Sequence, residues 1–132
     1  MIAVNNFSRM ENRKLFQQYD VIWIDDPQPL GMIPMIKVIH PEIPLLWRCH
    51  VHADPEPSIR TYLSEVLEGV FNVDTHKIIH KFMLEKFNLD MTKLVKEKLR
   101  VNGAIFHLKE FAKGLKLSNE VPVFIMGPVF YL

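Results

Sequence analysis

Cysteine and glycine are scarce in this chain. Cys49 is the only cysteine among the 132 residues, so no internal disulfide can form, and a reducing compartment, the cytoplasm, is expected. The five glycines form neither a Gly-x-Gly-x-x-Gly pattern nor a P-loop. The sequence therefore contains neither of these two phosphate-binding loops.

Long apolar runs and an excess of one charge are missing as well. No run of about 18 apolar residues is present, and the first 13 residues lack the apolar core of a signal peptide, so we expect no membrane segment. The net charge of +1 gives no reason to expect binding to nucleic acid or to an anionic membrane. With 48% hydrophobic and 23% charged residues, the composition is that of a single globular domain, here residues 1–132.

Short apolar runs that alternate with helical patterns predict a parallel α/β sheet. Bounded by turn signals, they read as buried strands at Asp20 to Ile24, Leu45 to Cys49, Ala104 to His107 and Val121 to Met126. Connections of a dozen or more residues between strands imply parallel pairing. We expect a three-layer α/β domain with a mainly parallel sheet of about four strands.

Helical patterns lie before and between these strands. They are expected at 7–19, up to Ile39, from Ser58 to Leu67, within 72–102 and from Lys109 to Leu117. The segment 72–102 carries two such patterns, from Asp74 to Phe87 and from Met91 to Leu99. It therefore predicts a helical hairpin inserted between the second and third strands.

Polar side chains follow the predicted strands, where the ligands of open α/β sheets bind. Asp25 and Asp26 end the first strand, His50 follows the second, and His107 ends the third. Carboxylates accept hydrogen bonds from sugar hydroxyls, and histidine can donate or accept them. This edge of the sheet is expected to hold a hydroxyl-rich ligand.

The same residues also have structural interpretations. Asp25 and Asp26 belong to a residue type that is common in turns and helix caps. Arg48 lies within an apolar strand, where a lone charge is costly, so an ion pair across the sheet with Asp25 or Asp26 is expected. Cys49 is expected to be a small buried residue with no role as a nucleophile.

Two pairs of histidines have spacings that suit metal ligands. His50 and His52 would share one face of a strand, but only Asp54 lies nearby as a further ligand, so no metal site is expected. His76 and His80 are four residues apart on a predicted helix, and we interpret them as part of a solvated helix face.

Two strings of residues carry a family resemblance, Asp25-Asp26-Pro27-Gln28-Pro29 and Trp47-Arg48-Cys49-His50. With Ile105-Phe106-His107 and Ile125-Met126-Gly127-Pro128 they resemble, in the same order, motifs in the N-terminal domain of retaining glycosyltransferases of the trehalose synthase type, which have the GT-B fold and belong to family 4. The resemblance covers roughly 19–64 and 101–128. It departs from the family at Asp25, where the family has histidine, and at His52, where the family has aspartate.

The resemblance implies that glucose is transferred from a nucleotide-glucose to a glucose acceptor. It assigns substrate binding to Asp26, Gln28, Arg48, His50 and His107, and it leaves the catalytic residue unknown. UDP- or ADP-glucose would be a substrate, and no cofactor is expected. Since the donor-binding domain of the family has no counterpart in this sequence, we expect a Rossmann-like half-domain that is inactive as an isolated chain. Activity would need a separate donor-domain chain as a partner, or missing sequence.

A non-catalytic binding or assembly module, derived from a truncated glycosyltransferase, is the alternative function. The departures at Asp25 and His52 and the inserted segment 72–102 favour it. The apolar ending from Val129 to Leu132 favours it too, because an exposed apolar tail suggests a partner or self-association.

Overall fold

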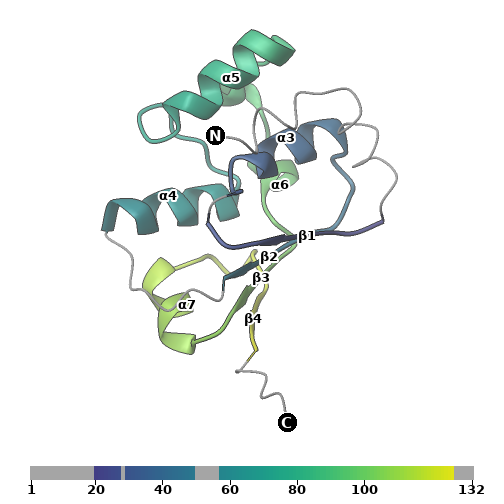
Figure 1. Ribbon diagram of the computed structural model, residues 1–132. Helices are drawn as coiled ribbons and strands as arrows, with labels where there is room; N and C mark the ends of the chain where they lie inside the picture. Colours follow the sequence, from purple (N-terminus) through teal and green to yellow (C-terminus); the bar gives the residue numbers. More distant parts are fainter. Residues whose placement is uncertain (1–19, 28, 50–56, 127–132) are drawn as a thin grey trace.

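The described residues, 20–27, 29–49 and 57–126, form a four-stranded parallel sheet in this computed structural model, with helices between the strands (Figure 1). In the order β1-β2-β3-β4, the strands are β1 (Ile22–Asp25), β2 (Leu45–Cys49), β3 (Gly103–Phe106) and β4 (Val123–Ile125). The helices are α3 (Met32–Ile39), α4 (Pro57–Glu68), α5 (Lys77–Phe87), the 3-10 turn η1 (Met91–Lys93), α6 (Lys96–Leu99) and α7 (Lys109–Leu115). The predicted α/β class and parallel sheet are confirmed. Within these residues, no helix has both the length and the hydropathy needed to cross a membrane.

The register of the strands sorts their side chains onto two faces. Ile24 of β1 pairs with Trp47 of β2, which pairs with Ala104 of β3. Residues in register point to the same side of a sheet, and successive residues of a strand alternate between sides. On β1, β2 and β3 the face that contains Trp47 is buried and comprises Ile22, Ile24, Leu45, Trp47, Cys49, Ala104 and Phe106. On the edge strand β4 the same face carries Val123 and Ile125, which are exposed. This face is the core of the domain.

The described helices lie on the side of this buried face. Figure 1 shows α3, α4 and α6 on one side of β1, with α7 beside β3. The opposite face, which we call the open face, carries Trp23, Asp25, Leu46, Arg48, Ile105 and Phe124. Strands that follow one another in sequence order, joined by right-handed crossovers, bring their helices to the same side. The described residues therefore form the sheet and one helical layer, on its buried face, as in an α/β Rossmann-like half-domain.

Trp47 is the largest fully buried side chain of the core. Its ring packs against Phe106 in an edge-on geometry, with 5.7 Å between the ring centroids. Its indole Nε1 donates a hydrogen bond of 2.8 Å to the backbone oxygen of Asp26. Because the one polar group of the ring has a partner, the burial of tryptophan carries no penalty for an unpaired donor. Cys49, at the end of the same strand, is buried as predicted.

A buried lysine ties α3 to the start of two strands. Lys37 donates to the backbone oxygen of Ile43 at 2.8 Å and to Oδ1 of Asn102 at 2.6 Å. The same Oδ1 accepts a hydrogen bond of 2.8 Å from the backbone nitrogen of Leu45. Burial lowers the pKa of Lys37, because the ammonium loses hydration, and the nearby charge of Glu42 acts in the opposite direction.

Gly69 ends α4 with a backbone that favours glycine. Its φ is +76°, in the left-handed region. A Cβ atom at this position would lie 2.4 Å from the backbone oxygen of Lys96, so α6 can lie this close to the end of α4 only because residue 69 has no side chain. The helix predicted from Ser58 to Leu67 is confirmed as α4.

The segment 72–102 differs from the predicted hairpin in its second arm. The helix expected from Met91 to Leu99 is replaced by η1 and α6, with Val95 between them in an extended conformation. Met91 and Leu99 are nevertheless buried. The apolar spacing thus correctly identified Met91 and Leu99 as core residues. The helix expected between them is interrupted at Val95, a β-branched residue in an extended conformation.

His76 lies inside the protein, so the prediction of a solvated helix face was wrong for this residue. α5 begins at Lys77, and His76 therefore precedes the helix and turns inward, with 1% of its surface exposed. Its Nε2 lies 2.9 Å from a carboxylate oxygen of Glu65 on α4. The rings of Tyr62 and Phe71 pack against it, with centroid distances of 4.6 and 5.2 Å. Burial lowers the pKa of His76, whereas the hydrogen bond and the charge of Glu65 act to raise it.

Removing the Asn102 side chain should destabilise the fold. In Asn102→Ala, the backbone nitrogen of Leu45 and the ammonium of Lys37 both lose an acceptor, which should lower the free energy of unfolding by about 2 kcal/mol. Urea denaturation measures this loss. Asn119→Ala, at an exposed position after α7, is the matched control and should change the free energy by less than about 0.5 kcal/mol. Equal losses in the two variants would contradict this role of Asn102.

The lowered pKa of His76 predicts that stability decreases in acid. The unfolded chain binds a proton at His76 below the ordinary pKa of 6.5, whereas the buried ring resists protonation in the folded state. The free energy of unfolding should therefore fall as the pH decreases from 7.5 to 5. His76→Gln should flatten this part of the profile, measured by urea denaturation at each pH. His40→Gln, at the end of α3, should keep the wild-type slope, and a wild-type slope in His76→Gln would refute the assignment.

Candidate functional site at the carboxyl edge of the sheet

The carboxyl edge of the sheet brings predicted site residues to one side of the domain. Asp25 pairs in register with Arg48, and Arg48 pairs with Ile105. Asp26 and the half-buried His107 directly follow β1 and β3, so both lie at this edge. Adjacent strands are about 4.8 Å apart, which puts the chain positions of Asp26 and His107 about 10 Å from each other. Side chains at this separation can contact one small ligand.

Pairing with β2 fixes the backbone of Asp26. Its nitrogen donates to the backbone oxygen of Arg48 at 2.7 Å, and its own oxygen accepts from the indole of Trp47. Its φ is 69°, a left-handed conformation that aspartate adopts more readily than most side chains. Such uncommon backbone geometry is held in place by the surrounding structure and is frequent at functional sites.

Arg48 forms the ion pair that its position predicted. Its Nε lies 2.9 Å from Oδ1 of Asp25, and the indole nitrogen of Trp23 donates to the same oxygen at 2.8 Å. The guanidinium carbon also lies 5.7 Å from the centre of the Trp23 ring. Asp25 thus balances the charge of Arg48. The two side chains are 39% and 45% exposed, so the pair contributes at most about 1 kcal/mol, and Arg48 can exchange it for a ligand at little cost.

Part of the predicted site lies outside the described residues. These positions are Gln28, His50, His52, Gly127 and Pro128. The predicted helix at 7–19 and the apolar ending at 129–132 lie outside them too. Their roles remain predictions. Among the described residues, no group of three histidine, cysteine, aspartate or glutamate side chains has an arrangement that could hold a metal ion.

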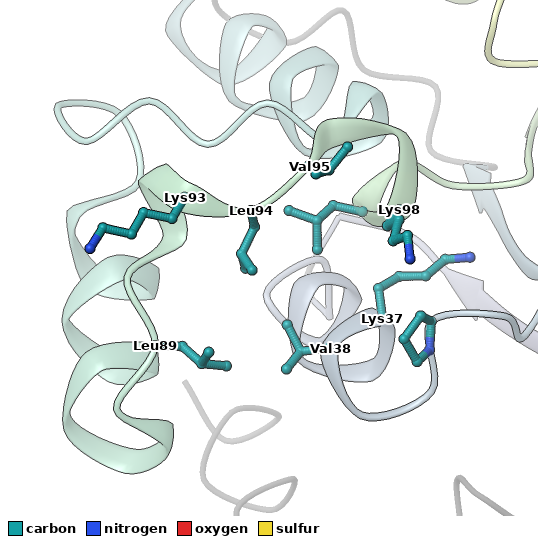
Figure 2. Close-up of a pocket in the computed structure, with 9 residues that line it drawn as sticks. Lys37, Val38, Leu89, Lys93, Leu94, Val95 and Lys98 are labelled. Carbon is teal, nitrogen blue, oxygen red and sulfur yellow. The ribbon is translucent and has the colours of Figure 1, made fainter.

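A groove of about 380 Å³ lies away from this edge, and it was not predicted from the sequence (Figure 2). Its lining consists of Lys37, Val38, Pro41, Leu89, Lys93, Leu94, Val95, Lys98 and Leu99. Pro41 belongs to the loop that leads into β2, so the groove lies near the amino edge of the sheet. The groove is mainly apolar, and its residues form no motif.

A known family matches the first part of the chain. Its description is trehalose synthase, N-terminal domain, and the match covers residues 2–83, which contain β1, β2 and the turn that begins at Asp26. The matched range includes the strings Asp25 to Pro29 and Trp47 to His50, and it ends within the segment 72–102. Ile105-Phe106-His107 lies beyond it.

Shorter similarities connect the chain with fungal proteins. A stretch of 32 residues is 53% identical to trehalose phosphorylase from Pleurotus pulmonarius, and one of the same length is 50% identical to trehalose phosphorylase from Grifola frondosa. Each match covers 24% of this chain and 4% of the relative, so the chain spans only a small part of the curated relatives it matches. No solved structure matches. Because the family match covers more than half of the 132 residues and includes β1 and β2 of the candidate edge, the chain belongs to the trehalose synthase N-terminal domain family.

Proposed function

We propose that this chain forms the acceptor side of a trehalose-related glycosyltransferase, which transfers glucose from a nucleotide-glucose to a second glucose. Membership of the trehalose synthase N-terminal domain family supports the link to trehalose. The single observation that carries the proposal is that Asp26, Arg48 and His107 lie along one carboxyl edge of a parallel sheet. Ligands of open α/β sheets bind at such edges.

Each of these residues has a role in holding the acceptor. The carboxylate of Asp26 accepts hydrogen bonds from sugar hydroxyls, and the imidazole of His107 donates or accepts one. Arg48 donates from an exposed guanidinium that Asp25 holds beside the edge. The family resemblance assigns Gln28 and His50 to the same ligand. In the sequence, Gln28 comes two residues after Asp26, and His50 directly follows β2.

The proposal includes a second domain of a GT-B, family 4 architecture, supplied by further sequence or by a separate chain. That domain would hold UDP- or ADP-glucose as a substrate, while this chain orients the acceptor hydroxyl. The isolated chain is then inactive in glucose transfer. Carbohydrate metabolism is the corresponding process, and the presence of a single cysteine in the sequence, Cys49, supports a reducing location, the cytoplasm.

The fungal relatives favour a second candidate reaction, the cleavage of trehalose by phosphate. The observation behind it is the identity of 53% over 32 residues with a trehalose phosphorylase. Both reactions would place one glucose unit at the carboxyl edge. They differ in their substrate pairs, which are nucleotide-glucose with glucose in the first and trehalose with phosphate in the second.

Glucose binding tests the acceptor site. Titration of isotope-labelled protein with millimolar glucose should shift the backbone amide signals of Asp26 and His107. Asp26→Asn removes the charge and still tolerates the left-handed backbone, and His107→Ala removes the ring. Each should weaken binding by about tenfold, the equivalent of about 1.4 kcal/mol. His40→Ala, at the end of α3, is the matched control and should keep the wild-type affinity.

The same titration shows what would contradict the proposal. Glucose-induced shifts confined to the groove between α3 and 89–99 would place the sugar elsewhere. If the isolated chain formed trehalose from UDP-glucose and glucose, the claim that it holds only the acceptor side of the active site would be refuted. A repeat of the titration with trehalose and inorganic phosphate, in which phosphate tightens trehalose binding, would favour the second reaction over the first.

A further inference from the structure

The groove beside α3 is an apolar recess whose charged side chains all have the same sign. Its lining consists of six apolar residues and three lysines, and none of the described residues that line it is acidic. The lysines come from α3, η1 and α6, so three elements direct positive charge to one recess. Its volume of about 380 Å³ lies in the range of small-molecule sites, roughly 300 to 1,000 Å³.

The interrupted second arm of the segment 72–102 forms one wall of the groove. Leu94 and Val95 are both extended, between the end of η1 and the start of α6. Val95 is 55% exposed and Leu94 is half-buried, although both are apolar. An apolar ligand that covers these side chains removes their surface from water, which is favourable. The wall therefore suits the hydrocarbon part of a ligand.

The charge of Lys37 has only neutral hydrogen-bond partners in the part of the chain that the structure describes. Its ammonium donates to the backbone oxygen of Ile43 and to the side-chain oxygen of Asn102. The carboxylate whose charge acts on it, Glu42, is not part of the lining. Loss of hydration at Lys37 makes the ammonium costly, and an anion in the groove would offset that cost.

Lys98 is the cation best placed to hold a negative head group. The carboxylate next to it in the sequence, Glu97, lies 3.5 Å from Arg100. Lys98 is exposed, so its ammonium is accessible to a ligand from solution. Lys93 turns its nitrogen away from Lys98 in Figure 2.

The charged and apolar parts of the groove are separated along its length. In Figure 2 the nitrogen atoms of Lys37 and Lys98 lie at one end of the groove. Leu89 lies towards the other end, and Val38 and Leu94 lie between the two ends. This arrangement matches a molecule with a negative head and an apolar tail.

We propose that this groove binds a small anionic amphiphile, an unbranched monocarboxylate whose head group lies beside Lys98 and whose chain lies along Val38 and Leu94. At about 30 Å³ per non-hydrogen atom, the volume of one water molecule in the liquid, the groove holds about 12 such atoms. Decanoate, with ten carbon and two oxygen atoms, has this size. A sugar or nucleotide would leave the apolar lining without a matching surface, and a two-chain phospholipid exceeds the volume.

Titration of the isotope-labelled full chain with sodium decanoate tests the site. A ligand of this size should bind with a Kd on the order of 100 µM. The amide signals of Val38, Leu94 and Lys98 should shift, and those of Asp26 and His107 should not, because the groove lies away from the carboxyl edge. Decyltrimethylammonium, with the same tail and a positive head, should bind at least tenfold more weakly.

Two variants of Val95 separate the effect of charge from that of shape. Val95 precedes α6 as its N-cap residue and makes no side-chain cap hydrogen bond, so aspartate and asparagine are both suited to this position. Val95→Asp places a negative charge in the groove and should raise the Kd for decanoate at least fivefold relative to Val95→Asn. The two variants should have the same stability towards urea within error.

A matched pair on α6 tests the head-group contact. Lys98→Met keeps the length of the side chain and removes its charge, and it should raise the Kd for decanoate about fivefold. Lys96→Met makes the same change at an exposed position of the same helix outside the lining, and it should leave the Kd within twofold of the wild type.

Four results would overturn the proposal. One is a chain whose amide signals in the groove do not respond to millimolar decanoate, which would also be the result if another part of the chain filled the recess. Another is equal affinity for decanoate and decyltrimethylammonium. A third is the same Kd in Val95→Asp and Val95→Asn. The last is a chain that sediments with vesicles of phosphatidylglycerol but does not bind decanoate, which would make the groove part of a membrane-binding surface. None of these results bears on the sugar site at the carboxyl edge.

Discussion

The position of Trp47 is the constraint on which both the core and the candidate site depend. Its ring fills the centre of the buried face and packs against Phe106. Its indole nitrogen holds the backbone oxygen of Asp26, the residue that begins the turn after β1. One side chain thus links the apolar interior with the polar edge. A change in the packing of the core would move the carboxylate of Asp26, because the same ring positions both.

Local signals predicted most of the fold. The apolar run from Leu45 to Cys49 corresponds to β2 at both ends, and Gly69 ends a helix as its residue type indicates. Both signals depend on residues close in the sequence. The second arm of the segment 72–102 could not be predicted in this way, because Met91 and Leu99 are buried by contacts with distant elements, and such contacts do not require a continuous helix.

Non-local contacts set the limits of prediction for the site as well. The ion pair of Arg48 was foreseen, because a charge within an apolar strand needs a partner and Asp25 was available. The burial of His76 was not foreseen, since it depends on a contact with Glu65 of α4 and on the start of α5 at Lys77, which leaves His76 outside the helix. The open face was also missed, because periodicity identifies strands but does not give their order. That order decides on which side the helices lie.

The sequential order of the strands also has a consequence for the time at which each part of the sheet can form. Every strand pairs with the one made just before it, so β1 and β2 can join while the rest of the polypeptide is still being synthesised. None of the four described strands has to wait for a later segment to be inserted between it and an earlier one. The sheet can therefore grow at one edge, in the direction of translation, and each step adds a complete strand-helix unit to a surface that already exists.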